Sequence, residues 1–211
     1  MIKKFSDFTN ESVRDRMTPK SDEEILDVLS QIPIYDRIVK ECELGLLDLV
    51  KKDVESGEEV GLNRFVNRPI NAAVNAGHYD VVEYLISMGS DVHRDEDHLL
   101  RQACHYGYTD IVRLLLDNGA DIHSIRDYSL QTASQNGHID TVKFLVDRGA
   151  TISANNNIAF YVACFYDRYD VAKYLFEKGA RPTHKNFREF VRVSNDKFTP
   201  RIRELIDPYL K

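Results

Sequence analysis

The 211-residue chain carries 28 Lys and Arg against 34 Asp and Glu, a formal net charge of −6, and 43% of its residues are hydrophobic. This charge is too small and this apolar content too high for an intrinsically disordered chain. No stretch approaches the ~20 consecutive apolar residues of a membrane span, and the first residues lack an apolar secretion signal. Three dispersed cysteines fit a reducing compartment, and the acidic middle of the chain disfavours nucleic acid. We therefore expect a folded cytoplasmic protein that binds neither membrane nor nucleic acid.

Residues 1–20 are predicted to form an N-terminal tail, which Pro19 separates from the first helix. A loosely docked tail is the default for a terminus with so weak a pattern. The spacing of Phe5, Phe8 and Glu11 is similar to short N-terminal peptides that direct internal proteins into tailed-phage heads. This similarity leaves a second function open, a virion or assembly component addressed by its tail.

Residues 21–63 are predicted to contain a capping helix and a divergent first unit of a repeat that becomes regular further on. Ser21-Asp22-Glu23-Glu24 has the form of a capping box and precedes an apolar helical pattern. Gly45 and Gly57 are predicted to end two helices, as the equivalent glycines do in the later units. Glu41 occupies a position that is alanine in those units. A terminal unit has one open face, so we expect this charge to be exposed.

Residues 64–183 consist of four units with a step of thirty residues: 64–93, 94–123, 124–153 and 154–183. Nine of the ten glycines fall into two columns, which are Gly45, Gly77, Gly107, Gly137 and Gly57, Gly89, Gly119, Gly149, Gly179. Two further columns hold Ala73, Ala103, Ala133, Ala163 and Leu85, Leu115, Leu145, Leu175. Columns in a common register indicate an array of similar supersecondary units.

Each unit is predicted to be a pair of helices. The first helix is expected to begin after an N-cap, supplied in the four units by Asn67, Asp97, Asp127 and Asn157. Its end is expected at a glycine such as Gly107, which favours the left-handed conformation of a C-cap. Asp110 and its equivalents fall in the first turn of the second helix, where the helix dipole favours a carboxylate. In the link to the next unit, Ile122 is expected to pack under the helices.

The columns resemble the ankyrin repeat. The residues that carry the resemblance are Asn75-Ala76-Gly77-His78-Tyr79-Asp80-Val81-Val82, Gly119-Ala120-Asp121-Ile122 and Gln135-Asn136-Gly137-His138-Ile139-Asp140. Ankyrin units usually have ~33 residues; the shorter step is similar to ankyrin arrays encoded by large DNA viruses, which would place the chain in the host-cell cytoplasm. The resemblance implies an all-α, ankyrin-type helix-pair solenoid with short hairpin fingers. It also implies a scaffold that binds a partner protein without catalysis or cofactor.

Residues 184–211 are predicted to form a helical C-terminal cap. Phe187, Phe190 and Val191, followed by Ile202 and Leu205, repeat the two-helix pattern. Pro200 suits the first turn of the last helix.

No motif typical of nucleotide binding, hydrolysis or zinc catalysis is present, so no catalytic residue is predicted. His78 and His138 are interpreted as structural residues of a turn. His93 and His123 are one unit apart, too far to share a metal ion, so no metal ligand is predicted. Cys104 and Cys164 are interpreted as buried core residues. An enzyme or enzyme regulator stays a third alternative, which would need a polar pocket of converging titratable groups.

Partner binding is predicted on the concave side of the array, which first-helix positions line in the ankyrin pattern. These positions are Ala72, Asn75, Ala76, Gln102, His105, Tyr106, Thr132, Gln135, Asn136, Val162, Phe165 and Tyr166. Aromatic residues carry much of the binding energy at interfaces, which makes Tyr106, Phe165 and Tyr166 the expected anchors. Packing of the last two against the C-terminal cap is the alternative. The predicted contacts of this monomer are Gln102, His105, Tyr106, Arg126, Gln135, Asn136, Phe165 and Tyr166.

Overall fold

The computed structural model describes residues 22–56, 68–181, 191 and 198–209. The helices are α2 (Asp22–Ser30), α3 (Ile34–Leu44), α4 (Leu47–Glu55), α5 (Arg68–Ala76), α6 (Tyr79–Ser87), α7 (Arg94–Tyr106), α8 (Thr109–Asp117), α9 (Ser124–Asn136), α10 (Ile139–Asp147), α11 (Ala154–Phe165), α12 (Tyr169–Glu177) and α14 (Pro200–Ile206), followed by the 3-10 turn Asp207–Tyr209. The predicted tail 1–20, the N-cap Asn67, and Phe187 and Phe190 of the predicted cap lie outside these residues.

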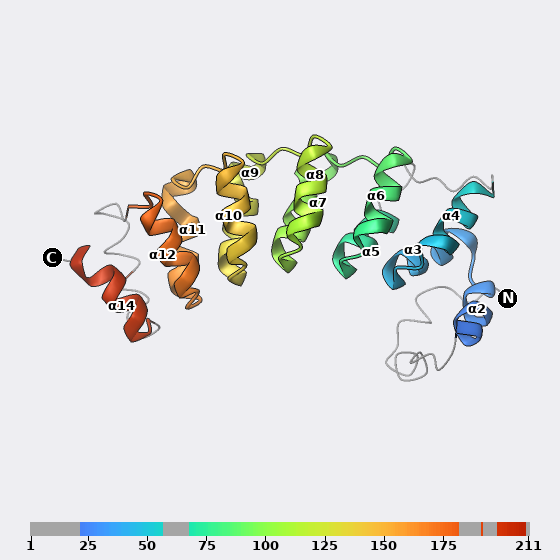
Figure 1. Ribbon diagram of the computed structural model, residues 1–211, viewed down its shortest axis with the longest axis horizontal. Coiled ribbons are helices and arrows are strands. Elements are labelled where there is room, and N and C mark those ends of the chain that lie inside the picture. The colour runs from blue at the N-terminus through green and yellow to red at the C-terminus, as the bar shows by residue number, and fades with distance from the viewer. Residues whose placement is uncertain (1–21, 57–67, 182–190, 192–197, 210–211) are drawn as a thin grey trace.

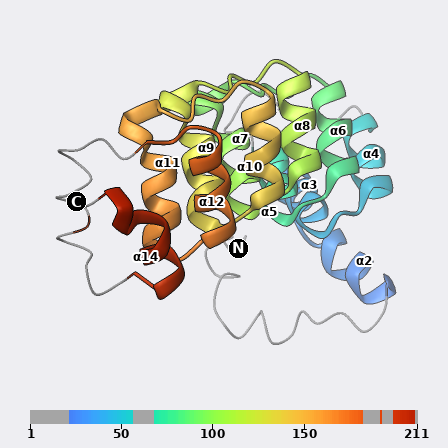
Figure 2. The same ribbon diagram turned by 60° about the vertical axis from the view of Figure 1, so that its left-hand side comes forward.

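Helix pairs stack along a line and form the array (Figure 1). The pairs α3/α4, α5/α6, α7/α8, α9/α10 and α11/α12 follow one another in chain order, and each packs on its neighbours. Figure 2 shows the same units one behind another. The prediction of an all-α helix-pair solenoid is confirmed.

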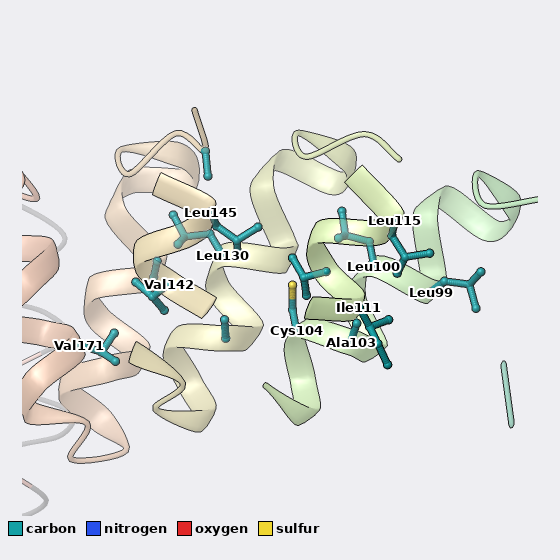
Figure 3. Close-up of a cluster of buried hydrophobic side chains, with 14 of the residues drawn as sticks. Leu99, Leu100, Ala103, Cys104, Ile111, Leu115, Leu130, Val142, Leu145 and Val171 are labelled. Atoms are coloured by element: carbon teal, nitrogen blue, oxygen red, sulfur yellow. The ribbon is translucent and has the colours of Figure 1, made fainter. Parts of the chain in front are cut away.

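The core runs through the whole stack as a chain of small and large side chains. In the first helices, Ala73, Ala103, Ala133 and Ala163 are fully buried and let neighbouring helices approach closely. The second helices contribute bulkier residues such as Ile111 and Leu115, and Figure 3 shows such groups between successive helices. One unit alone would leave half of this surface in water, so each unit depends on its neighbours.

The two rows of helices pack differently along the array. Successive first helices, such as α7 and α9, contact each other extensively, whereas successive second helices, such as α8 and α10, touch much less. The small alanines explain the close approach of the first row.

The helix ends follow the expected glycine and aspartate columns. Gly107 and Gly137 end α7 and α9 in the left-handed conformation, with φ of 76° and 85°. Asp110 and Asp140 lie in the first turns of α8 and α10. Ile122 is half-buried and packs against the core, as predicted.

The N-cap prediction for Asp97, Asp127 and Asn157 is wrong. These buried residues each close a left-handed turn of three residues, with φ of 58°, 59° and 63° at the third. Asp97 Oδ1 accepts the N–H of Asp121 at 3.0 Å, and Asp127 Oδ1 accepts that of Thr151 at 2.8 Å. The carboxylates thus bind the backbone of the following finger instead of their own helix.

The fingers, which are the segments 88–97, 118–127 and 148–157 between successive helix pairs, therefore end in tight left-handed turns in place of two-stranded hairpins. Side chains join one finger to the next: Ser124 donates its hydroxyl to the Glu96 carbonyl at 2.8 Å. Within a finger, His123 Nδ1 lies 2.9 Å from Asp127 Oδ1. Asp and Asn tolerate left-handed backbone better than other non-glycine residues, which accounts for their frequency in these turns.

The terminal units differ from the inner ones. Helix α2 packs on α3 at the N-terminal end, and α14 packs on α12 at the other end, with Pro200 in its first turn. Glu41 is only 2% exposed, so the expectation of a solvent-exposed charge is wrong. Its carboxylate Oε1 lies 3.8 Å from Arg37 Nε, and this cation offsets part of the cost of burying the carboxylate.

Candidate partner-binding face

We call the exposed side of α5, α7, α9 and α11, together with the adjoining fingers, the first-helix face. The helical residues 68–76, 98–106, 128–136 and 158–165 contain no Asp or Glu. Each of the second helices α6, α8, α10 and α12 carries two. The array is therefore acidic on its second-helix side and free of helical carboxylates on the other.

The edge of the face is held by contacts between the glycine turns of successive units. His78 Nε2 lies 3.1 Å from the Glu43 carbonyl oxygen, and His138 Nε2 lies 2.9 Å from that of His105. Arg168 Nε donates to the equivalent carbonyl of Gln135 at 3.0 Å. Each side chain thus satisfies a free carbonyl at the end of the preceding first helix. The interpretation of His78 and His138 as structural turn residues is confirmed.

Tyr108 takes the histidine position in the second regular unit. Its ring stacks on Tyr106, with ring centroids 5.7 Å apart. The same Tyr106 ring meets His105 edge-on at 4.9 Å. The array's regular histidine contact is replaced here by an aromatic cluster that leaves Tyr106 43% exposed.

The structure distributes the predicted contacts over α7, α9 and the end of α11. Gln102, His105 and Tyr106 lie on α7, and Gln135 and Asn136 lie near the end of α9. Arg126 lies in the left-handed finger turn and is exposed. Phe165 ends α11 and Tyr166 follows it, with ring centroids 5.1 Å apart in an edge-to-face contact. Phe165 is half-buried, whereas Tyr166 is 45% exposed and accessible for binding.

A pocket of about 450 Å³ opens on this face between α7 and α9. Gln102, His105 and Thr132, three of the predicted face positions, contribute to its lining. The full lining consists of His98, Arg101, Gln102, His105, Ile125, Tyr128 and Thr132. Six of the predicted contacts are not part of it: Tyr106, Arg126, Gln135, Asn136, Phe165 and Tyr166.

Hydrogen bonds fix the orientation of the pocket's polar groups. The Asn136 side-chain amide donates to His105 Nδ1 at 3.2 Å, which places the proton of the neutral ring on Nε2. The Gln102 amide donates to His98 Nε2 at 3.3 Å. Burial and the neighbouring Arg101 guanidinium lower the pKa of His98, so its ring is neutral at neutral pH.

Arg101 joins the pocket to the finger. Its Nη1 donates to the Asp95 carbonyl at 3.1 Å and to that of Glu96. Both carbonyls belong to the left-handed turn at the start of α7. The guanidinium thus stabilises the finger while it contributes a positive charge to the pocket wall.

Four lining residues were not among the predicted positions: His98, Arg101, Ile125 and Tyr128. His98 and Tyr128 lie four residues before Gln102 and Thr132, one helical turn away on the same face. Extending the face by one turn toward the finger would have found them. Ile125 lies at φ 48° in the finger turn, which helical periodicity does not describe.

The described residues offer little reactive chemistry. Burial raises the pKa of Cys42 and of Cys164 to about 12, so both thiols are protonated. Cys104 is fully buried too, and the interpretation of Cys104 and Cys164 as core residues is confirmed. Within the described ranges, no group of three or more His, Cys, Asp or Glu side chains is arranged to hold a metal ion. Over the same part of the chain, no helix has the length and apolar character needed to cross a membrane.

Comparison with known proteins agrees with this architecture. The model of the family described as ankyrin repeats (3 copies) matches residues 39–126 and 123–186. Among solved structures, the human ASB11 ankyrin repeat domain is similar, with a TM-score of 0.65 and 24% sequence identity over 82% of this chain and 83% of that one. That likeness concerns the fold alone. No curated protein matches the sequence. Because the family model covers most of the chain, the protein belongs to the ankyrin repeat family.

Proposed function

We propose that this protein is a non-catalytic scaffold that binds a partner protein on the first-helix face. Ankyrin repeats generally mediate protein–protein interaction. In this proposal the chain acts as a cytoplasmic monomer, without cofactor or nucleic acid. The contacts are those predicted, Gln102, His105, Tyr106, Arg126, Gln135, Asn136, Phe165 and Tyr166, extended by the pocket between α7 and α9.

The exposure of large aromatic side chains on this face carries the proposal. Tyr106, Tyr128 and Tyr166 are all at least 40% exposed, and they come from three successive units. Large aromatic side chains that stay exposed gain little from burial in the fold, and aromatic residues are enriched at the centres of interfaces. A rigid array presents them in fixed positions, so binding requires little ordering of the scaffold.

The distribution of charge favours the same side. The second helices α6, α8, α10 and α12 carry two carboxylates each, whereas the first-helix residues 68–76, 98–106, 128–136 and 158–165 carry none. Charged residues are depleted at interface cores because their desolvation is costly. The acidic side would also repel nucleic acid. The first-helix face is therefore the better candidate for a protein contact.

The test is capture of partners from a cell lysate with the full chain and with the double variant Tyr106→Ala/Tyr166→Ala. Loss of the captured proteins, with thermal unfolding nearly unchanged, is the expected result. Tyr79→Ala is the matched control, because Tyr79 is 38% exposed on α6 of the second-helix side. Equal loss of capture in the control would contradict the proposal.

The alternative role as a virion or assembly component rests on the Phe5, Phe8 and Glu11 spacing. Purified particles that contain the full chain but exclude a variant lacking residues 1–20 would support it. Partner capture that survives the same deletion would favour the scaffold.

A further inference from the structure

We propose that the pocket between α7 and α9 holds an acidic side chain of the partner, from a segment in which an apolar residue adjoins the Asp or Glu. This inference rests on the proposed function, because it names the chemistry that the first-helix face recognises. Three observations support it: the donors in the pocket, the absence of carboxylates from its lining, and the conformation of Ile125.

The pocket presents hydrogen-bond donors to its occupant. The Arg101 guanidinium supplies a permanent positive charge. His105 accepts at Nδ1 from Asn136, so its Nε2 carries the proton and is the nitrogen that can donate. The Tyr128 hydroxyl adds a further donor to the same lining. A carboxylate accepts at both oxygens and is the protein side chain that best matches such a set.

No lining residue is an acid, so the positive charge is not neutralised inside the pocket. Asp95 acts electrostatically on His98, but its carboxylate lies outside the lining, 3.9 Å from Arg94 Nε. Arg101 contacts the finger through backbone carbonyls, which are neutral. The pocket therefore complements a negative charge and disfavours a positive one.

Ile125 indicates that the occupant also has an apolar part. The equivalent positions of the neighbouring fingers are Asp95 and Asn155, residue types that tolerate the left-handed conformation. A β-branched residue at φ 48° is strained, and the Ile125 side chain is also 45% exposed at the pocket. Backbone strain at a residue that keeps much of its side chain exposed is typical of binding sites. The volume of about 450 Å³ accommodates an acidic side chain and an apolar neighbour.

The experiment selects peptides from a random display library on the full chain and measures the affinity of the best synthetic peptide by fluorescence polarisation. We expect enrichment of Asp or Glu beside an apolar residue, and weaker binding at high salt. Thr132→Glu introduces a carboxylate into the pocket and should weaken the peptide at least about tenfold. Gln131→Glu adds the same charge one residue away, outside the lining, and should change the affinity less than about twofold.

A second variant separates binding from folding. Ile125→Asn relieves the strained backbone, so the variant should melt at a higher temperature than the wild-type chain yet bind the peptide several-fold more weakly. A purely structural role for Ile125 would lower the melting temperature and leave the affinity unchanged.

Several results would overturn the inference: selection of basic or uncharged peptides, failure to select any peptide, or equal effects of Thr132→Glu and Gln131→Glu. Displacement of the peptide by inorganic phosphate alone would assign the pocket to phosphate groups, which would also contradict the inference of an acidic side chain. None of these results bears on partner capture through Tyr106 and Tyr166, so the two proposals fail separately.

Discussion

The first unit and the second regular unit fill equivalent core positions with opposite chemistry. Counted from the glycines that follow them, Arg37, Glu41 and Asp53 in α3 and α4 correspond to Leu99, Ala103 and Leu115 in α7 and α8. The three apolar residues are at most 1% exposed. The inner unit is therefore held by packing at these positions and the terminal unit by an ionic cluster.

The ionic cluster is compact. Arg37 Nε contacts Asp53 Oδ2 and lies 3.8 Å from Glu41 Oε1. Burial, and next the neighbouring Asp53 carboxylate, raise the pKa of Glu41 to about 7. When Glu41 holds a proton, the Arg37 cation and the Asp53 carboxylate balance, and the cluster is close to neutral. Ionic groups in such a position lose hydration that their attraction only partly repays, whereas apolar groups gain from burial.

The same helix-pair backbone accepts either an ionic cluster or apolar packing, provided that all three positions change together. An inner unit has neighbours on both sides, so no water can solvate a charge at these positions. The terminal unit has some solvent access, since the Arg37 side chain is 25% exposed. Variants that mix the two chemistries should therefore be the most destabilising.

The largest effect is expected from Ala103→Glu, which puts the terminal unit's carboxylate into an inner unit. Ala103 is fully buried, and Leu99 and Leu115, which replace Arg37 and Asp53 in this unit, offer a carboxylate no partner. The free energy of unfolding should fall by more than about 4 kcal/mol, as measured by urea denaturation. Ala103→Ser, of similar size and uncharged, is the control and should cost much less. A loss below about 1 kcal/mol for the glutamate would show that the inner unit accommodates a charge after all.

Arg37→Leu should have the next largest effect. It leaves the Glu41 and Asp53 carboxylates buried together without their cation, at a cost of about 3 kcal/mol, because Glu41 can escape part of it by taking up a proton. A terminal unit can open without the rest of the array. Amide hydrogen exchange in α3 and α4 is therefore the measurement, with α9 and α10 as the internal reference. Unchanged protection in α3 and α4 would contradict the role given to Arg37.

The triple variant Arg37→Leu/Glu41→Ala/Asp53→Leu converts the cluster to the chemistry of the inner unit. Replacement of a buried ionic cluster by apolar residues of matching shape is often stabilising, and we expect a gain of about 2 kcal/mol in the same exchange experiment. The change in the free energy of unfolding of the triple variant should be more favourable than the sum of the three single changes, because the three residues contact one another. Destabilisation by the triple variant would mean that the ionic cluster is the better solution at this end.

The fold was predictable from the sequence because its repeats report it several times over. Each inner unit has glycine, alanine and leucine at the same positions, so an ambiguous pattern in one unit is resolved by the next unit. The terminal cluster was harder to predict, because Glu41 breaks a column, and a charge in the column of a terminal unit predicts an exposed surface. The simultaneous change at Asp53, in the leucine column, was the available signal that the charge has a buried partner.

The candidate site was predictable only in part. Gln102 and His105 follow from helical periodicity and lie in the pocket. Ile125 could not be found this way, because its contribution depends on a left-handed turn. The finger aspartates carried a misleading signal, since Asp97 precedes a helix as an N-cap does but binds the next finger. Local patterns of this kind do not encode contacts 24 residues away.

The smallest expected effect is a pH dependence that belongs to the terminal unit alone. Glu41 has a pKa of about 7 in the folded chain against an ordinary value of 4.5, so between these limits the folded chain binds more protons than the unfolded one. Stability must then fall as pH rises from about 4.5 to about 7 and level off above. Glu41→Gln keeps the shape without the ionisation and should remove this decline, on the order of 1–2 kcal/mol in the opening of α3 and α4.

The other carboxylates are present in both proteins and affect both alike, so the difference between wild-type and Glu41→Gln isolates the one group. Asp53 faces Glu41 directly, and Asp53→Asn should reduce the decline, because removing the second carboxylate lowers the pKa of Glu41 toward its ordinary value. Hydrogen exchange of α3 and α4 at a series of pH values, corrected for the intrinsic exchange rate, measures both effects. Parallel curves for wild-type and Glu41→Gln would mean that Glu41 is ionised throughout, and the contrast between a neutralised ionic cluster and an apolar core would no longer hold.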